Sequence, residues 1–144
     1  MHSPAALVEV TQRLDEQALR ALLALSVGFP TPEKLGALAA RYAADPAWSA
    51  YARLQSGRPV GVIGLQRLDQ RSIAIQHLAV AADVQRQGIG RDLLQYVRRL
   101  HGASELHVQT DAEAAGFYQR CGFAVVPLGE LYPGVERFHC HWPG

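Results

Sequence analysis

Apolar residues recur every three or four positions in the first third of the chain, after a short apolar stretch at Ala6–Val10 that predicts a strand. This spacing predicts two helices. Asp15 is the expected N-cap of the first helix, which should end at Gly28–Pro30. Thr31, followed by a proline, should start the second helix, and Asp45–Pro46 should end it.

From Trp48 onward the apolar period becomes two, which is typical of strands. Two strands, Trp48–Leu54 and Val60–Leu65, should form a hairpin, and a third strand should follow at Ile73–Val80. The remaining pattern predicts a helix from Ile89, a strand, a helix between a capping-box sequence and Gly122, and two short strands. Their expected positions are 89–101, 106–110, 110–122, 123–126 and 136–141.

This order of elements predicts one mixed α/β (α+β) domain that spans residues 1–144, with about seven strands and four helices. Apolar residues make up 49% of the chain and charged residues 19%, as in ordinary globular proteins. The formal net charge of +1 argues against a nucleic-acid partner. No stretch has the form of a signal peptide or a membrane span, so we expect a cytoplasmic protein without a membrane partner.

Residues Gln85–Gly90 read Gln-Arg-Gln-Gly-Ile-Gly and lie between a predicted strand and a predicted helix. The first amides of a helix lack intrahelical acceptors, and together with the helix dipole they can bind an anion such as a pyrophosphate. The sequence lacks the third glycine of a dinucleotide fingerprint and the lysine of a P-loop. An ordinary turn at a helix start is the alternative interpretation.

Two further sequences flank this turn at linked positions. Leu78-Ala79-Val80 precedes it, and Ala114-x-x-Phe117-Tyr118, followed by Gly122-Phe123, lies on the next predicted helix. With the turn, they resemble the GNAT superfamily of acetyl-CoA-dependent N-acetyltransferases. The resemblance implies a GNAT-like fold with a central mixed, mostly antiparallel twisted sheet.

The resemblance also implies roles for individual residues. The turn amides would hold the pyrophosphate of coenzyme A, and the backbone of the preceding strand would pair with pantetheine and polarise the thioester carbonyl. Asp111 stands where many relatives have asparagine, and it is also a candidate helix cap. The residues assigned to the cofactor are Leu78, Ala79, Val80, Gln85, Arg86, Gln87, Gly88, Ile89, Gly90, Arg91, Asp111, Ala114, Phe117 and Tyr118.

For catalysis, the resemblance assigns Tyr118 as the general acid that protonates the departing thiolate; a buried core aromatic is the alternative. His77 is the candidate base, although strict alternation places it on the opposite strand face from Gln76 unless a bulge intervenes. Other titratable candidates are Glu113, Glu130, Glu136, His139 and His141. His139 and His141 alternate on one strand, but without a recognisable third ligand we expect a solvated face and no metal.

The expected function is transfer of the acetyl group of acetyl-CoA to a primary amine by direct attack in a ternary complex. The acceptor class stays open among small amines, antibiotics, amino acids and protein N-termini. Val27–Thr31 and Leu128–Gly134 are candidate acceptor loops, and many relatives form homodimers through their C-terminal strands. The alternatives are an acetyl-CoA-binding sensor with little or no transferase activity and a protein that binds another nucleotide.

Overall fold

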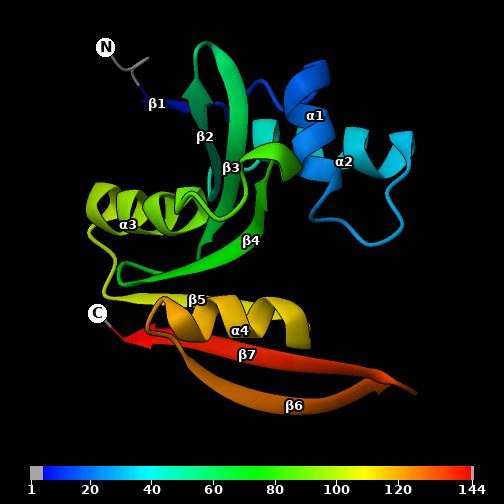
Figure 1. Ribbon diagram of the computed structural model, residues 1–144, viewed down its shortest axis with the longest axis vertical. Helices are drawn as coiled ribbons and strands as arrows, with labels where there is room; N and C mark the ends of the chain where they lie inside the picture. Colours follow the sequence, from blue (N-terminus) through cyan, green and yellow to red (C-terminus); the bar gives the residue numbers. More distant parts are fainter. Residues whose placement is uncertain (1–4, 144) are drawn as a thin grey trace.

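The computed structural model describes residues 5–143, which form a seven-stranded sheet with helices on both faces (Figure 1). The strand order is β1-β2-β3-β4-β5-β7-β6, and every neighbouring pair is antiparallel except β4 and β5. This arrangement confirms the predicted fold class. The elements are β1 (Ala5–Glu9), α1 (Gln17–Ala24), α2 (Pro32–Ala44), β2 (Trp48–Gln55), β3 (Arg58–Arg67), β4 (Ser72–Val80), the 3-10 helix η1 (Ala82–Val84), α3 (Ile89–His101), β5 (Glu105–Thr110), α4 (Ala112–Arg120), β6 (Ala124–Tyr132) and β7 (Val135–Pro143).

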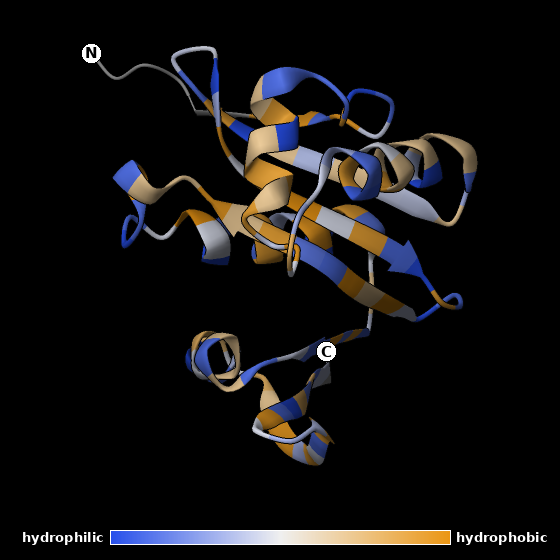
Figure 2. Cartoon of the chain, turned by 90° about the vertical axis from the view of Figure 1, so that its right-hand side faces the viewer, coloured by the Kyte–Doolittle hydropathy of each residue, from blue (hydrophilic) through white to orange (hydrophobic). Residues whose placement is uncertain are grey.

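Two apolar clusters lie on opposite faces of the sheet. Successive strand residues face opposite sides, so Ile63 packs with α3 and α4 whereas Val62 packs with α1 and α2. In Figure 2, which colours each residue by hydropathy, orange hydrophobic segments lie along the central strands and on the helices beside them. Helices α1 and α2 pack on β2, β3 and β4, and α4 packs on β6 and β7. The face of β5 and β7 opposite α4 therefore carries partly exposed polar side chains, including His107 and His139.

The hairpin between β2 and β3 forms as predicted, with Gln55 opposite Arg58 and positive φ angles at Ser56 and Gly57. Thr31 caps α2 by accepting a hydrogen bond from the Lys34 amide at 3.1 Å. The prediction that Asp15 caps α1 was wrong. Glu16 occupies the N-cap position, and its carboxylate pairs with Arg13 at 2.7 Å. Helix α1 also ends earlier than predicted, at Ala24.

In the second half of the chain, Asp111 caps α4, which confirms the role that the sequence offered as an alternative to cofactor contact. Thr110, the first residue of the capping-box sequence, remains in β5 opposite Phe138. The last hairpin is longer than expected, since β6 continues through most of the predicted Leu128–Gly134 loop to Tyr132. Strand β6 tolerates Pro127 because it lies at the edge of the sheet and its register shifts near that residue.

Candidate active site

The sheet splits between β4 and β5. These strands pair only where Ser72–Ala74 meets Glu105–His107, and they diverge beyond that point (Figure 1). Among the described strands, Ile75–Val80 therefore have a partner on the β3 side but none on the β5 side. Unpaired backbone groups along a strand edge can bind an extended ligand as an added strand would. The Leu78–Val80 segment that the sequence assigned to the cofactor lies on this edge.

At the end of β4, the turn before α3 presents a run of unpaired amides. Among the described residues, no acceptor binds the backbone N–H groups of residues 85–91, and Gly88 caps α3 without a side-chain hydrogen bond. Left-handed backbone at Arg86 and Gly88, with φ angles of 70° and 80°, curls the chain here. Such turns form concave anion sites, so the geometry fits the predicted phosphate-binding turn.

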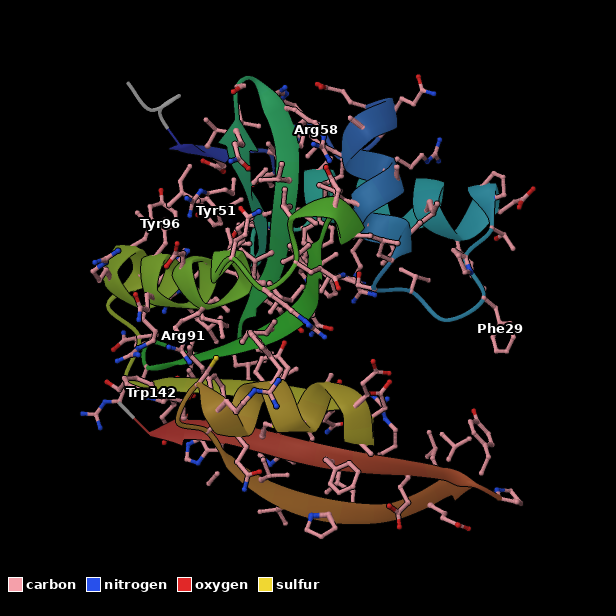
Figure 3. All side chains as sticks on the ribbon, viewed as in Figure 1. Phe29, Tyr51, Arg58, Arg91, Tyr96 and Trp142 are labelled. Carbon is pink, nitrogen blue, oxygen red and sulfur yellow. The ribbon has the colours of Figure 1, made fainter. Side chains whose placement is uncertain are left out.

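Positive charge accompanies these amides. Arg86 is exposed in the turn itself, and Arg91 lies between α3 and α4 (Figure 3). Arg91 lines a groove of about 330 Å³ together with Arg98 and Arg120. Guanidinium groups can bind phosphate oxygens through paired N–H donors, so this groove is a concentration of positive charge beside the first turn of α3.

Tyr118 lies in the core between α4 and the sheet. Its side chain is 4% exposed, and its ring contacts Phe117 and Phe123 edge-on at centroid distances of 5.1 and 5.2 Å. Burial raises the pKa of the Tyr118 hydroxyl above its usual value, so the phenol keeps its proton at neutral pH. This position is compatible with both interpretations of Tyr118, as acid and as core aromatic.

Asp111 uses its carboxylate as a helix cap. Its Oδ1 atom accepts a hydrogen bond from the Ala114 amide at 2.9 Å. Phe117 packs against the turn, because a Cβ at Gly90 would lie only 3.1 Å from the Phe117 ring. Ala114 and Phe117 are partly buried against the same core as Tyr118. Of the cofactor residues predicted on α4, Phe117 thus packs against the first turn of α3.

His77 points to the opposite face of the sheet from Tyr118. Leu65 pairs with Ile75 and Gly64 with His77, so Gln76 is an extra residue in a β-bulge. The bulge places His77 in contact with Tyr42, whose hydroxyl lies 2.6 Å from His77 Nδ1. Gly64 permits this arrangement, because a Cβ there would collide with the Tyr42 hydroxyl. Burial lowers the pKa of His77 to about 4, so its ring is neutral at pH 7.

The split sheet, the amide-lined turn and the aromatic pair on α4 together match a known family. The model of the acetyltransferase (GNAT) domain matches residues 44–125, which is more than half of the chain. The chain belongs to the GNAT family of acetyltransferases. Comparison with curated proteins gives no match.

Solved GNAT structures share the fold over nearly the whole chain. A GNAT-family protein from Desulfovibrio desulfuricans is 22% identical with a TM-score of 0.79, and the match covers 97% of this chain and 99% of that one. The ribosomal-protein-S18-alanine N-acetyltransferase of Escherichia coli is 20% identical with a TM-score of 0.74, covering 97% and 94%. A GNAT acetyltransferase from Elizabethkingia anophelis with acetyl-CoA bound is 20% identical with a TM-score of 0.70, covering 97% and 98%.

A groove of about 750 Å³ opens at the split of this GNAT sheet, on the face that carries Gln76. Most of its lining is polar, and it comes from β3, β4, β5 and β7. Sequence reasoning missed several of these residues, since their side chains come together only through the pairing of β3 with β4 and of β5 with β7. The lining includes Gln66, Gln76, His107, Gln109, Arg137 and His139.

The remaining candidates lie outside this groove. Glu113 is in the first turn of α4, and Glu130 faces Glu136 across the exposed end of the last hairpin. Phe29, in the predicted Val27–Thr31 loop, is 89% exposed and projects away from the rest of the chain (Figure 3). Within residues 5–143, no helix is both long and apolar enough to span a membrane.

Proposed function

We propose that this GNAT protein transfers the acetyl group of acetyl-CoA to a primary amine by direct attack in a ternary complex. The observation that carries the proposal is the free edge of β4, which runs from the unpaired amides of residues 85–91 to the polar groove at the split. One end of this path suits a diphosphate and the other a polar acceptor. The edge between them suits an extended linker such as pantetheine.

In this proposal, the amides of residues 85–91 and the Arg91 side chain hold the phosphates of the coenzyme. Backbone groups of Leu78–Val80 pair with pantetheine, and an amide N–H in this segment polarises the thioester carbonyl as charge develops on its oxygen. The donors are fixed by β3–β4 pairing, so they need little reorganisation during the reaction. Asp111 contributes indirectly, by capping α4.

Tyr118 is the proposed acid, which gives its proton to the sulfur as the carbon–sulfur bond breaks. The raised pKa of its hydroxyl guarantees a protonated donor. A thiolate expelled beside the same buried ring is also deprived of solvent, so its pKa rises too. The pKa of the departing thiol therefore stays closer to that of the Tyr118 hydroxyl than the raised pKa of Tyr118 alone suggests.

The low pKa of His77 points to an amine that does not need a strong base. The Nε2 lone pair of His77 is free only in the tautomer whose Nδ1–H donates to the Tyr42 oxygen. With a pKa of about 4, the neutral His77 ring is also a weak proton acceptor. Freeing a lysine-like amine at pH 7 costs roughly 4–5 kcal/mol, against about 1 kcal/mol for an α-amine. We therefore propose an acceptor with a weakly basic amine, such as an α-amine, with water or His77 as the final proton acceptor. The E. coli relative, an alanine N-acetyltransferase by name, is similar in fold.

The second candidate is an acetyl-CoA-binding sensor with little transferase activity. The engagement of His77 by Tyr42 and of Asp111 by the Ala114 amide favours it, because both side chains then serve the fold. It requires the same cofactor site but no efficient acceptor chemistry.

The test combines binding with thiol release. Calorimetry should detect binding of acetyl-CoA, with ATP and NAD as comparison ligands. Release of coenzyme A should then be measured with two matched sets of primary amines, amino-acid amides and peptides with amine pKa near 8 and alkylamines near 10.4. Faster turnover of the first set supports the proposed acceptor class, whereas preference for alkylamines overturns it. Binding without turnover of any amine favours the sensor, and absence of acetyl-CoA binding contradicts both.

A further inference from the structure

Three histidines and a glutamate gather on the face of β5 and β7 opposite α4. His107 and His141 are directly opposite in the β5–β7 pairing, and their rings stack at 4.7 Å. The carboxylate of Glu105 reaches both, with Oε2 lying 3.7 Å from His107 Nε2 and Oε1 lying 3.7 Å from His141 Nε2. All three ligand atoms lie within 4.8 Å of one another. We call Glu105, His107 and His141 the β5–β7 triad.

Two neighbouring side chains orient the triad. Ser72 Oγ donates a hydrogen bond to Glu105 Oε2 at 2.8 Å, and His107 Nδ1 lies 3.0 Å from His139 Nε2. When Nδ1 of His107 carries the proton and donates to His139, its Nε2 lone pair is directed toward Glu105 and has no proton of its own. Metal-bound histidines and carboxylates are commonly held by outer partners of this kind.

His141 supplies the least expected observation. Its Nε2 atom is shielded from solvent and has no hydrogen-bond partner among the described residues. A buried polar atom without a partner is costly, because it loses its bonds to water and gains none in return. A ligand placed between this atom and Glu105 would remove the deficit.

We propose that the β5–β7 triad binds a first-row divalent cation, with Zn²⁺ as the best match to its donors. Two imidazoles and one carboxylate are a common zinc ligand set, and they leave a fourth position for water. In a tetrahedral zinc site the ligand atoms are about 3.3 Å apart, close to the 3.7 Å that separates each histidine from Glu105. Binding requires the stacked rings of His107 and His141 to tilt apart so that both lone pairs converge on one ion.

The position of the triad sets the expected effect. Glu105 and His107 belong to the short stretch of β5 that pairs with β4, and His141 belongs to β7. A bound cation would therefore tie β7 to the strand that joins the two parts of the sheet, and it should stabilise the folded chain. Since Ser72, His107 and His139 also line the groove at the split, the ion would lie at the edge of that groove. The inference is independent of the proposed acetyl transfer.

The test uses the tag-free full chain, stripped with a chelator, and Zn²⁺ alone as the probe. We expect saturable one-to-one binding by calorimetry, and a rise of about 5–10 °C in Tm at a hundredfold excess over Kd. Glu105→Gln and His141→Gln should each weaken binding at least tenfold, and His139→Gln should weaken it about 10–100-fold as an orienting partner. His101→Gln, on α3, is the matched control and should leave binding unchanged.

Circular dichroism of each metal-free variant will establish that it is folded before its affinity is compared. If Zn²⁺ does not raise the Tm of the parent chain, or if Glu105→Gln and His141→Gln bind it as tightly as the parent, the triad is not a metal site. Equal loss of binding in His101→Gln would also overturn the proposal, because that residue lies outside the triad. The absorption bands of bound Co²⁺ give a second readout, which should indicate tetrahedral coordination and disappear in His141→Gln.

Discussion

Gly90 and Phe117 form one packing contact, although they come from different parts of the GNAT sequence pattern. A Cβ at Gly90 would lie 3.1 Å from Phe117 Cζ and 3.8 Å from Val80 Cγ2. The glycine thus lets the first turn of α3 approach both α4 and β4. By contrast, a Cβ at Gly88 would meet open space, and a φ of 80° is what favours glycine there.

Replacing Gly90 by alanine should destabilise the protein by about 1–2 kcal/mol, because the added methyl group overpacks the contact with Phe117. Urea unfolding of Gly90→Ala, Phe117→Leu and the double variant measures the coupling between the two positions. The double variant should be more stable than the sum of the single effects predicts. Gly88→Ala is the control: its cost comes from the backbone, so it should add to that of Phe117→Leu. If the effects of Gly90→Ala and Phe117→Leu on the free energy of unfolding also simply add, the contact between Gly90 and Phe117 is contradicted.

Tyr118→Phe should lower kcat about 10²–10⁴-fold while acetyl-CoA binding changes little, because the variant keeps the buried ring and removes only the proton donor. Single-turnover assays and calorimetry measure the two quantities separately. Tyr96→Phe, at a partly buried tyrosine of α3 (Figure 3), is the matched control and should retain full turnover. An unchanged kcat in Tyr118→Phe would reject Tyr118 as the acid and indicate that it is a buried core aromatic.

Local sequence signals predicted the elements to which we assign the coenzyme. The turn at Gln85–Gly90, the strand before it and the helix that carries Phe117 and Tyr118 each depend on neighbouring residues. The Thr31 cap and the β2–β3 hairpin are equally local, and both are confirmed.

The proposed acceptor groove depends on long-range pairing, which local patterns do not encode. Strand β7 inserts between β5 and β6, and this order brings His107 beside His139 and His141. The bulge at Gln76 likewise depends on how β3 and β4 align, and it decides which face His77 occupies. Glu105 and His107 were missed as potential metal ligands for this reason, since no sequence spacing links them to His141.

The buried His77 should make stability depend on pH. Its pKa is about 4 in the folded chain and about 6.5 when unfolded, so the unfolded chain binds an extra proton as the pH falls from 6.5 toward 4. Stability is therefore full above pH 6.5 and declines through this window, with a loss of about 2 kcal/mol between pH 7.5 and 5 from this residue. Urea unfolding of the parent and of His77→Gln at both pH values measures the difference. If both proteins lose the same free energy, His77 is not the cause.

The proposed acceptor chemistry predicts the pH dependence of kcat/KM. His77 is deprotonated above about pH 4, and the raised pKa of Tyr118 keeps the acid protonated through the alkaline range. The ionisation of the amine should then dominate the profile. The rate should rise about tenfold per pH unit below the pKa of the acceptor and level off above it, because only the neutral amine attacks. Profiles from pH 5.5 to 9.5 for two acceptors of different pKa should have inflections that move with the amine. A fixed inflection near pH 6.5, lost in His77→Gln, would instead show that His77 titrates as an ordinary base in the working enzyme.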